Sequence, residues 1–419
     1  MKNDINKDML FPPIINGKIE EIYPWTGFWH DHADCVRYLF KKILPLKNVD
    51  RKNDSTIHKY FGSSRVYLLD SGRSSILLAL KVLGIKAQDE VILTAFNCPA
   101  VVEPILYTKG VPRFIDINPT CGIDFDLLKK SINCRTRGII VTHTFGLIDD
   151  LDNLSRLCRE RNIFLINDLS QTLENTLSDI KLNRYGDISV YSFGPEKQLF
   201  ALGGGAMVVN REDLLKKAEI NLPEDFVSFS SILMTFARRW KYYFSFFIYV
   251  SFSELLSFFI LTGLVYNFGK EKNIKIDQGN TSIKNMNSFQ KSILARKLLE
   301  HKNNIEATLD NFIYIKNNLR FTLLSAEKML PLYATMILSE GERFDVSEYL
   351  SKNGVQTVWN YLPLYKSSDI SVDPNSLPNT EQMWKRVLSI PFRYPINKKR
   401  IKEICRIINS YDKNEDHRN

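Results

Sequence analysis

Between residues 64 and 210 the chain repeats one pattern of hydrophobic and polar positions: a short β-branched run, a turn, then a helical segment. The β-branched runs predict strands at 65–69, 90–94, 112–116, 138–142, 163–167, 188–193 and 206–209. Between the early strands, apolar residues at i, i+3 and i+4 predict helices, for example at 75–83 and 151–161. This alternation predicts an α/β fold with a mostly parallel sheet that is covered on both faces.

The same pattern divides the chain into four segments. Residues 1–62 form an irregular N-terminal segment, because Pro12, Pro13 and Pro24 interrupt any long element. We predict a large domain at 63–220, an aromatic hydrophobic insertion or linker at 221–285, and a smaller C-terminal domain at 286–419, which begins with a helical pattern.

The composition is that of an ordinary globular protein. Hydrophobic residues make up 44% and charged residues 25% of the 419 residues, which excludes a disordered or fibrous chain. The net charge of +9 suits a phosphate, a nucleic acid or an acidic membrane surface. Nucleic acid is not a predicted partner, because no basic run is interleaved with aromatic residues along a recognition element.

The cysteines and the N-terminus indicate a cytoplasmic protein. The six cysteines have no CxxC spacing, which is typical of reduced thiols, and the first residues lack the apolar run of a secretion signal. The cluster from His30 to Cys35 has residue types that bind metals, but no distant motif completes it. We interpret it as a polar segment that enters an amphipathic helix and predict no metal site.

A phosphate site is one interpretation of the turn after the first predicted strand. In parallel sheets, ligands bind beyond the carboxyl ends of the strands. Gly72, Arg73 and Ser74 open a helix there and offer backbone N–H groups, a hydroxyl and a guanidinium to an anion. The alternative is a serine that only caps the helix.

Further polar residues follow the fourth and fifth predicted strands. His143 follows the fourth, and Asp168 and Gln171 follow the fifth. A carboxylate buried at a strand end is costly unless it meets a cation, so Asp168 is a candidate ligand-binding residue. Capping of the next helix is the alternative role.

A lysine follows the sixth predicted strand. Lys197 comes shortly after Ser192, and three glycines at 203–205 precede the next strand. Desolvation and cationic neighbours make such a lysine a candidate Schiff-base nucleophile, although a solvated surface lysine is the default. The order of phosphate turn, carboxylate and lysine is the order that a pyridoxal phosphate site requires.

These motifs together resemble those of a known family. The residues from Ser71–Gly72 through Asp-Leu-Ser-Gln (168–171) to Ser-Phe-Gly-Pro-Glu-Lys (192–197) are similar to the DegT/StrS-type sugar aminotransferases. The resemblance covers residues 62–215 and resumes at the segment that begins with Asn379. It implies a fold-type I pyridoxal-phosphate (PLP) transferase: a large domain with a mostly parallel seven-stranded sheet and a smaller C-terminal α+β domain.

The resemblance also implies roles for individual residues. Lys197 is the expected catalytic residue, which forms the Schiff base with PLP and then moves a proton. Asp168 is expected to hold the ring nitrogen protonated, and Gln171 to contact the ring hydroxyl. The phosphate is expected at the turn and the serine described above, with His143 near the ring. These cofactor-binding residues are Gly72, Arg73, Ser74, Cys98, His143, Asp168, Gln171, Ser192 and Lys197.

Three positions depart from the family pattern. Arg73 replaces the usual threonine, and it either adds a phosphate contact or directs its side chain elsewhere. The family's ring-stacking aromatic falls on Cys98, so Phe96 or a different cofactor pose is the alternative. The family's stretch that contacts the neighbouring subunit's phosphate has Asn285 at its arginine position. A homodimer is therefore expected from the resemblance alone.

Residues 240–268 hold twelve aromatic residues, and from Tyr242 to Phe268 the only charge is Glu254. The length is enough to span a membrane, but a span would separate the C-terminal domain from the sheet. Burial within the protein or at the dimer interface is one interpretation. Peripheral contact with anionic lipid at the inner face of the membrane is the other, because basic residues flank the segment.

The expected function is that of a PLP-dependent aminotransferase. By resemblance, it moves an amino group from an amino acid such as glutamate to a keto-sugar, usually nucleotide-linked, for amino-sugar or cell-surface polysaccharide biosynthesis. The departures leave two alternatives: an aminotransferase for a lipid-linked or apolar carbonyl substrate, or a non-catalytic PLP-binding sensor or scaffold. Lys197 argues against the family's dehydratase branch, which has histidine there.

Overall fold

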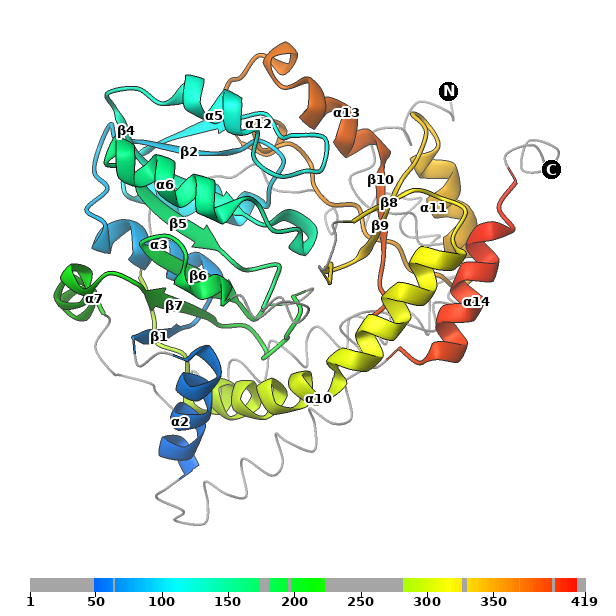
Figure 1. Ribbon diagram of the computed structural model, residues 1–419, viewed down its shortest axis with the longest axis horizontal. Coiled ribbons are helices and arrows are strands. Elements are labelled where there is room, and N and C mark those ends of the chain that lie inside the picture. The colour runs from blue at the N-terminus through cyan, green and yellow to red at the C-terminus, as the bar shows by residue number, and fades with distance from the viewer. Residues whose placement is uncertain are drawn as a thin grey trace, which may run out of the picture.

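The computed structural model describes residues 49–62, 65–173, 181–194, 197–222, 282–325, 330–368, 370–393 and 396–412. A twisted sheet with helices against it fills one side of the molecule, and a smaller lobe lies on the other side (Figure 1). A long helix runs from beneath the sheet to the small lobe. The predicted polar cluster at 30–35 and the aromatic segment at 240–268 lie outside the described residues.

The large sheet confirms the predicted strands, each within two residues of its predicted ends. The strands are β1 (Val66–Leu69), β2 (Glu90–Thr94), β3 (Val111–Ile115), β4 (Thr136–Thr142), β5 (Phe164–Asp168), β6 (Ile188–Ser192) and β7 (Gly205–Val209). Their order is β1-β7-β6-β5-β4-β2-β3. Strand β7 pairs antiparallel with β1 and β6, and the other pairings are parallel, so the sheet is mostly parallel as predicted.

Both faces of the sheet are buried. Along β4, Ile140 joins the cluster under one helical layer, whereas Ile139 and Val141 join the cluster on the opposite face. The first layer contains α3 (Gly72–Val82), α4 (Val102–Tyr107) and α7 (Leu215–Asn221), and the second contains α5 (Phe125–Ser131) and α6 (Leu151–Arg161). Successive side chains of a strand point to opposite faces of the sheet, so each strand contributes to the hydrophobic cores on both faces.

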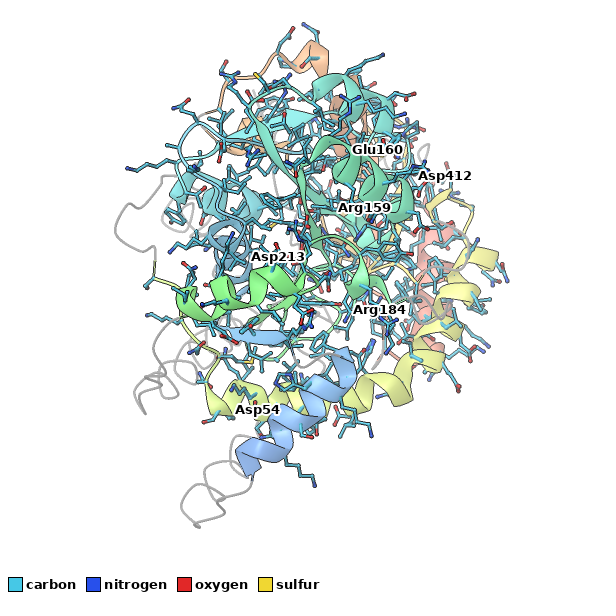
Figure 2. The ribbon with its side chains drawn as sticks, turned by 60° about the vertical axis from the view of Figure 1, so that its left-hand side comes forward. Asp54, Arg159, Glu160, Arg184, Asp213 and Asp412 are labelled. Carbon is cyan, nitrogen blue, oxygen red and sulfur yellow. The ribbon has the colours of Figure 1, made fainter. Side chains whose placement is uncertain are left out.

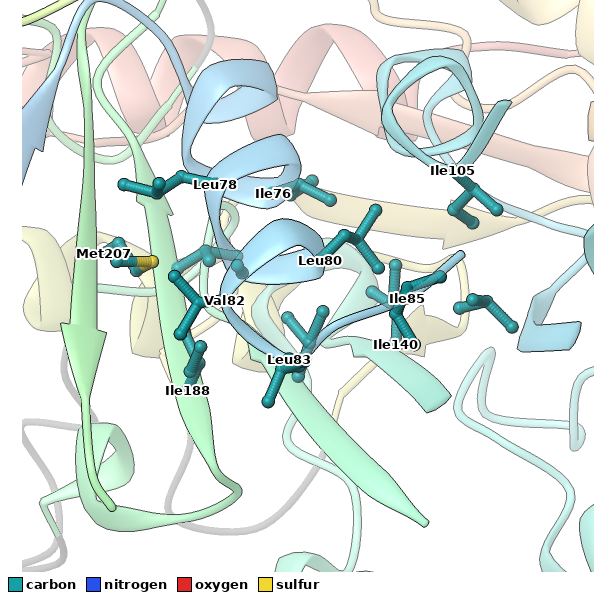
Figure 3. Close-up of a cluster of buried hydrophobic side chains, with 14 of the residues drawn as sticks. Ile76, Leu78, Leu80, Val82, Leu83, Ile85, Ile105, Ile140, Ile188 and Met207 are labelled. Atoms are coloured by element: carbon teal, nitrogen blue, oxygen red, sulfur yellow. The ribbon is translucent and has the colours of Figure 1, made fainter. Parts of the chain in front are cut away.

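Helix α3 shows how one helical layer is built. Its N-cap is Ser71, whose side chain accepts a hydrogen bond from the N–H of Ser74. Its apolar side chains, among them Leu78 and Val82, lie over the sheet with Met207 and Ile188 (Figure 3). This packing holds the N-terminus of α3 at the carboxyl edge of the sheet.

Two further helices cover the other face near β1. Helix α2 (Val49–Phe61) packs beside the first part of α10 (Ser288–Asn318). Helix α10 begins with a capping box that Asn287 and Gln290 form. The first part of α10 joins the large-sheet core through Leu294, and the last part joins the small-lobe core through Ile315. One helix thus belongs to both cores, and the predicted division at residue 286 stays a prediction.

The small lobe has the predicted α+β character. An antiparallel sheet of order β10-β9-β8 is formed by β8 (Leu323–Leu324), β9 (Ala334–Ile337) and β10 (Val387–Ile390). The helices of this region are α11 (Arg343–Lys352), α13 (Pro378–Arg386) and α14 (Lys398–Asn409), whereas α12 (Leu364–Ser367) lies against the large sheet, where Leu364 joins the core under α3. Short 3-10 helices lie at Pro99–Val101, Thr144–Gly146, Leu182–Arg184, Glu212–Leu214 and Pro374–Ser376.

The lobes meet through apolar and polar contacts. An aromatic group joins Phe96 and Phe145 of the large lobe to Tyr361, with ring centroids 6.0–6.2 Å apart. The Asp116 carboxylate, just after β3, accepts hydrogen bonds from the backbone N–H groups of Asn379 and Thr380 at the start of α13.

Charged side chains surround this framework. Arg159 and Glu160 are exposed at the end of α6, and Asp213 is exposed before α7 (Figure 2). Among the helices of the described ranges, none combines the length and apolar character that crossing a membrane requires.

Candidate active site

The parallel register of the sheet brings the predicted site residues to one edge. Thr142, the last residue of β4, lies opposite Asp168, the last residue of β5. Asp168 in turn lies opposite Val190 of β6. Because carboxyl ends of neighbouring parallel strands meet at the same edge, the loops with His143, Gln171 and Lys197 start side by side.

Asp168 is buried, with 1% of its surface exposed. Its Oδ2 accepts a hydrogen bond from the Thr142 hydroxyl at 2.8 Å, and its Oδ1 accepts one from the N–H of Ser170 at 3.0 Å. Among the described residues no cation pairs with it. A buried carboxylate with only neutral donors favours a cationic ligand N–H group.

Gln171 presents a buried donor without an acceptor. Its Oε1 accepts a hydrogen bond from the N–H of Phe145 at 2.8 Å, which fixes the amide orientation because a backbone N–H only donates. Its Nε2 is buried and has no hydrogen-bond partner in the described part of the chain. A buried donor of this kind is rare and points to an acceptor on a ligand.

Lys197 lies in the loop after β6, and its side chain is half-buried. The next residue, Gln198, ties the loop to the one after β5. Its Nε2 donates to the carbonyl oxygen of Gln171 at 3.1 Å, and its Oε1 accepts from the N–H of Leu173 at 2.9 Å. These two bonds bring the predicted lysine and glutamine loops together.

The predicted phosphate turn forms the N-terminus of α3. Ser71 and Ser74 share a hydroxyl contact of 2.9 Å, and the Ser74 hydroxyl donates to Asp70 at 2.6 Å. Ser192 lies against the same turn, because a Cβ atom added to Gly72 would come within 2.7 Å of the Ser192 Cβ. Only glycine at position 72 permits this approach, and helix N–H groups with two strand-end serines suit an anion.

Arg73 takes the second of the two orientations considered from the sequence. Its Nε pairs with Glu103 of α4 at 2.8 Å, and about half of its side chain is exposed. Arg73 lies at the N-terminus of α3, where the helix dipole disfavours a positive charge, and the Glu103 carboxylate offsets this effect. A direct phosphate contact by the Arg73 side chain stays a prediction.

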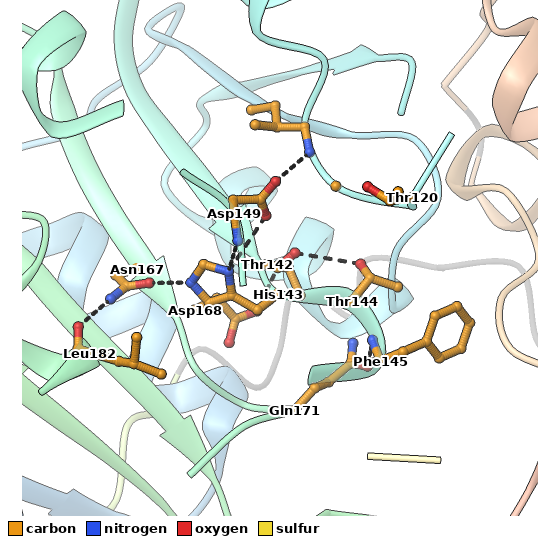
Figure 4. A network of polar contacts seen from close by, with 12 residues as sticks. Thr120, Thr142, His143, Thr144, Phe145, Asp149, Asn167, Asp168, Gln171 and Leu182 are labelled. Atoms are coloured by element: carbon orange, nitrogen blue, oxygen red, sulfur yellow. Dashed lines mark hydrogen bonds and ion pairs between the residues drawn. The ribbon is translucent and has the colours of Figure 1, made fainter. Parts of the chain in front are cut away.

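His143 is completely buried, and both of its ring nitrogens have protein partners (Figure 4). Nδ1 accepts a hydrogen bond from the N–H of Asp149 at 3.2 Å, and Nε2 lies 2.7 Å from Asn167 Oδ1. Asn167 Nδ2 donates to the carbonyl of Leu182, so Asn167 Oδ1 is the acceptor and Nε2 carries the proton. Only the face of the His143 ring is then available for contact with a cofactor.

Cys98 remains half-buried at the start of the loop after β2, and its N–H donates to Asn97 Oδ1 at 2.7 Å. Phe96 is fully buried between the lobes. The structure therefore assigns Phe96 to the contact between the lobes, and a cofactor-stacking role for Cys98 stays a prediction.

Two site residues were not predicted from the sequence. Asn97 and Thr142 are both buried, and Asn97 Nδ2 donates to Thr142 Oγ1 at 2.9 Å. The sequence signal for Thr142 is a hydroxyl at the last position of a strand, next to His143, but threonine is common in strands. Asn97 has no such signal, because its partner lies 45 residues away.

A pocket of about 480 Å³ lies beside this edge, between the loops that follow β3 and β4. Its lining includes four aspartates: Asp124, Asp126, Asp149 and Asp150. Asp149 Oδ2 lies 3.4 Å from His143 Nδ1, so one wall adjoins the histidine. Four carboxylates disfavour the binding of a diphosphate in this pocket.

Comparison with known proteins finds relatives of this chain and of its fold. Residues 48–245 match the model of the DegT/DnrJ/EryC1/StrS aminotransferase family. The matched segment is similar to this family, which confirms the resemblance found in the sequence. The fold of the described residues is that of a fold-type I PLP transferase, also as expected.

Curated relatives match less than half of the chain. The UDP-N-acetyl-3-dehydro-alpha-D-glucosamine 3-aminotransferase of Acidithiobacillus ferrooxidans is 32% identical over 148 residues, which is 35% of this chain and 40% of that protein. The 3-oxo-glucose-6-phosphate:glutamate aminotransferase of Bacillus subtilis is 28% identical over 199 residues, 45% of this chain and 43% of that protein. The chain thus matches about 40% of the length of these relatives.

A solved structure supports the fold over a longer range. NtdA from Bacillus subtilis, solved with bound cofactor PMP, has a TM-score of 0.65 and 20% identity, and the match covers 97% of this chain and 89% of that one. At this identity, the likeness concerns the fold.

The described residues fit PLP. The buried Nε2 of Gln171 is a donor that a ring oxygen would satisfy, and the Asp168 carboxylate is an acceptor that a ring N–H would satisfy. The turn at Gly72 leaves no room for a Cβ beside Ser192, as expected of a close anion cradle. The three groups lie at one edge, with the Lys197 loop tied to Gln171.

Proposed function

We propose that this protein is a PLP-dependent aminotransferase that moves an amino group from glutamate to a keto-sugar. The observation that carries the proposal is the unpartnered buried Nε2 of Gln171 beside the buried Asp168, at the edge where the Lys197 loop begins. A ligand with an acceptor oxygen and a donor nitrogen would satisfy both groups, and PLP has these two atoms.

Each residue then has a defined task. When bound, PLP supplies an electrophilic carbonyl and an electron-withdrawing ring. Asp168 would accept a hydrogen bond from the protonated ring nitrogen, Gln171 Nε2 would donate one to the ring oxygen, and the N-terminus of α3 with Ser192 would bind the phosphate. Lys197 would hold the carbonyl carbon of the cofactor through its Nζ atom, and its free amine would accept and return the proton of the substrate carbon.

The acceptor is proposed to be a keto-sugar that carries phosphate. The names of the two relatives above specify a UDP-linked sugar and a sugar 6-phosphate. The net charge of +9 is compatible with either anion. Among these two we propose the nucleotide-linked sugar, with amino-sugar or cell-surface polysaccharide biosynthesis as the process.

The first prediction concerns the bound cofactor. Purified protein mixed with PLP is expected to show a visible absorption band that bleaches on addition of glutamate. Lys197→Ala is expected to lose both responses, because the band requires the Nζ atom. The control is Lys216→Ala, which removes an exposed lysine of α7. A band that persists in Lys197→Ala contradicts the proposed role.

The same glutamate-treated protein tests the acceptor. Return of the band with a UDP-linked keto-sugar, and not with a keto-sugar 6-phosphate, supports the nucleotide-linked acceptor. Return of the band with the keto-sugar 6-phosphate, and not with the UDP-linked keto-sugar, contradicts the nucleotide-linked acceptor. A protein that binds PLP but does not bleach with any amino donor is the sensor or scaffold considered from the sequence.

We also propose that the chain acts as a homodimer in the cytoplasm. The resemblance of residues 283–290 to a stretch that contacts the neighbouring subunit supports this proposal. Sedimentation equilibrium is expected to give twice the mass of 48.6 kDa, and a monomer mass contradicts it. Flotation of the full chain with anionic vesicles, compared with a deletion of 242–268, tests the alternative of lipid contact.

A further inference from the structure

A chain of hydrogen bonds leads from the loop after β2 to the carboxylate of Asp168. The N–H of Cys98 donates to Asn97 Oδ1 at 2.7 Å, Asn97 Nδ2 donates to Thr142 Oγ1 at 2.9 Å, and the Thr142 hydroxyl donates to Asp168 Oδ2 at 2.8 Å. Asn97 is fully buried and Thr142 is 5% exposed, so water does not compete for these bonds.

The direction of each bond follows from the first. A backbone N–H only donates, so the atom of Asn97 that faces Cys98 is the oxygen. The amide nitrogen therefore faces Thr142 and donates to its hydroxyl oxygen. The single hydroxyl proton of Thr142 is left to point at Asp168.

The carboxylate of Asp168 is thereby held from two sides. Oδ2 accepts from Thr142, and Oδ1 accepts from the N–H of Ser170 at 3.0 Å. The two donors sit on different strand ends, so the plane of the carboxylate cannot rotate without breaking one bond. A carboxylate oxygen has two lone pairs, and one bond to each oxygen leaves room for a further donor.

We propose that Thr142 and Asn97 are positioning residues for Asp168. Thr142 fixes the carboxylate so that a free lone pair faces the ring nitrogen of PLP, and Asn97 fixes the proton of Thr142. This inference rests on the proposed function, because the ring nitrogen belongs to the cofactor of that function.

The test compares the affinity of the apo-protein for two ligands. One is PLP, and the other is its carbocyclic analogue in which a C–H group replaces the ring nitrogen. Thr142→Val keeps the shape and removes the hydroxyl, whereas Thr142→Ser keeps the hydroxyl as the matched control. We expect Thr142→Val to weaken PLP binding about tenfold. Thr142→Ser is expected to stay close to the wild type.

The analogue separates positioning from a general structural role. Because it offers no ring N–H to Asp168, its affinity is expected to be the same in the wild type and Thr142→Val. Equal losses for both ligands overturn the inference, since they show damage to the whole site. If Thr142→Val does not fold, by the unfolding curve of the apo-protein, Thr142→Ala replaces it.

A double-mutant cycle tests the part of Asn97. Asn97→Leu alone is expected to weaken PLP binding by less than Thr142→Val, and to add nothing in the Thr142→Val background. Additive losses overturn the relay through Thr142. A wild-type protein that binds no PLP overturns the proposed function as well, whereas binding with equal losses overturns this inference alone.

Discussion

At the scale of single residues, burial without a partner is the most informative property of this protein. Gln171 carries a buried donor that the described chain does not use, and it lies at the predicted site. His301 of α10 also has a buried nitrogen, Nε2, with no hydrogen-bond partner in the described part of the chain. Burial and the nearby charge of Arg393 lower the pKa of His301 from 6.5 to about 4. Gln171 thus indicates a bound ligand, and His301 predicts that the stability of the protein depends on pH.

The second prediction concerns His301 and pH. Because its pKa is lower in the folded than in the unfolded protein, the unfolded state binds more protons below pH 6.5. The stability from the neutral imidazole is complete above that pH and is lost as the pH falls toward 4. We expect this histidine to lower the free energy of unfolding by about 2 kcal/mol between pH 7 and pH 5.

Urea unfolding of the wild type and His301→Gln at several pH values measures this loss. The variant has no titrating group at this position, so its curve is expected to fall less between pH 7 and pH 5. Carboxylates elsewhere titrate equally in both proteins and cancel in the difference. Parallel curves would show that His301 does not contribute.

At the scale of elements, helix α13 receives its N-terminal hydrogen bonds from a distant strand end. Its own N-cap position, Leu377, has no side-chain cap. Instead, the Asp116 carboxylate after β3 accepts from the N–H groups of Asn379 and Thr380 and from the Thr380 hydroxyl, each at 2.7–2.8 Å. An anion at a helix N-terminus is favourable, and here it also joins the two lobes.

The third prediction is that Asp116→Ala destabilises the protein by about 2–3 kcal/mol. The reason is that three donors at the start of α13, two of them buried, lose their acceptor. The measurement is the free energy of unfolding in urea. Asp126→Ala is the control, because Asp126 is an exposed aspartate in the first turn of α5 and should change stability by less than about 0.5 kcal/mol. Equal effects of the two substitutions would argue against the cap.

At the scale of the whole molecule, α10 joins the two cores. Leu298 lies in the core under the large sheet, and Phe312 lies in the core of the small lobe. Ala307 is exposed between them, so a change at this position alters the helix without altering either core. The active-site edge belongs to the large lobe, and the helix sets how the small lobe sits against it.

The fourth prediction uses Ala307 to interrupt the helix. Ala307→Pro is expected to lower the free energy of unfolding by about 3 kcal/mol or more, and Ala307→Gly by about 1 kcal/mol, since proline removes a helix hydrogen bond and glycine only adds flexibility. Circular dichroism and cofactor absorbance, followed during urea unfolding, are expected to shift together. Separate transitions would show that the two cores unfold independently.

Much of the fold and part of the site could be predicted from the sequence. The strands were found because each is a buried apolar run between turns, which is a local property of the chain. Asp168 and Gln171 were found because polar residues at strand ends are conspicuous. The sequence left two orientations of Arg73 open, because its partner Glu103 lies on another helix. Thr142 was missed because a threonine fits any strand.

The amino-acid sequence is enough to predict the alternation of strands and helices, the order of the site residues along the chain and the edge at which they meet. Local patterns of burial and turn formation are enough for these. The pairing of the polar groups follows from the folded structure alone: Asn97 bonds to Thr142, Thr142 to Asp168, and Asp116 to α13. The same holds for Gln171 Nε2, which has no partner among the described residues. These partners lie 26 to 264 residues apart, and a hydrogen bond depends on atomic distance and direction, which packing alone sets.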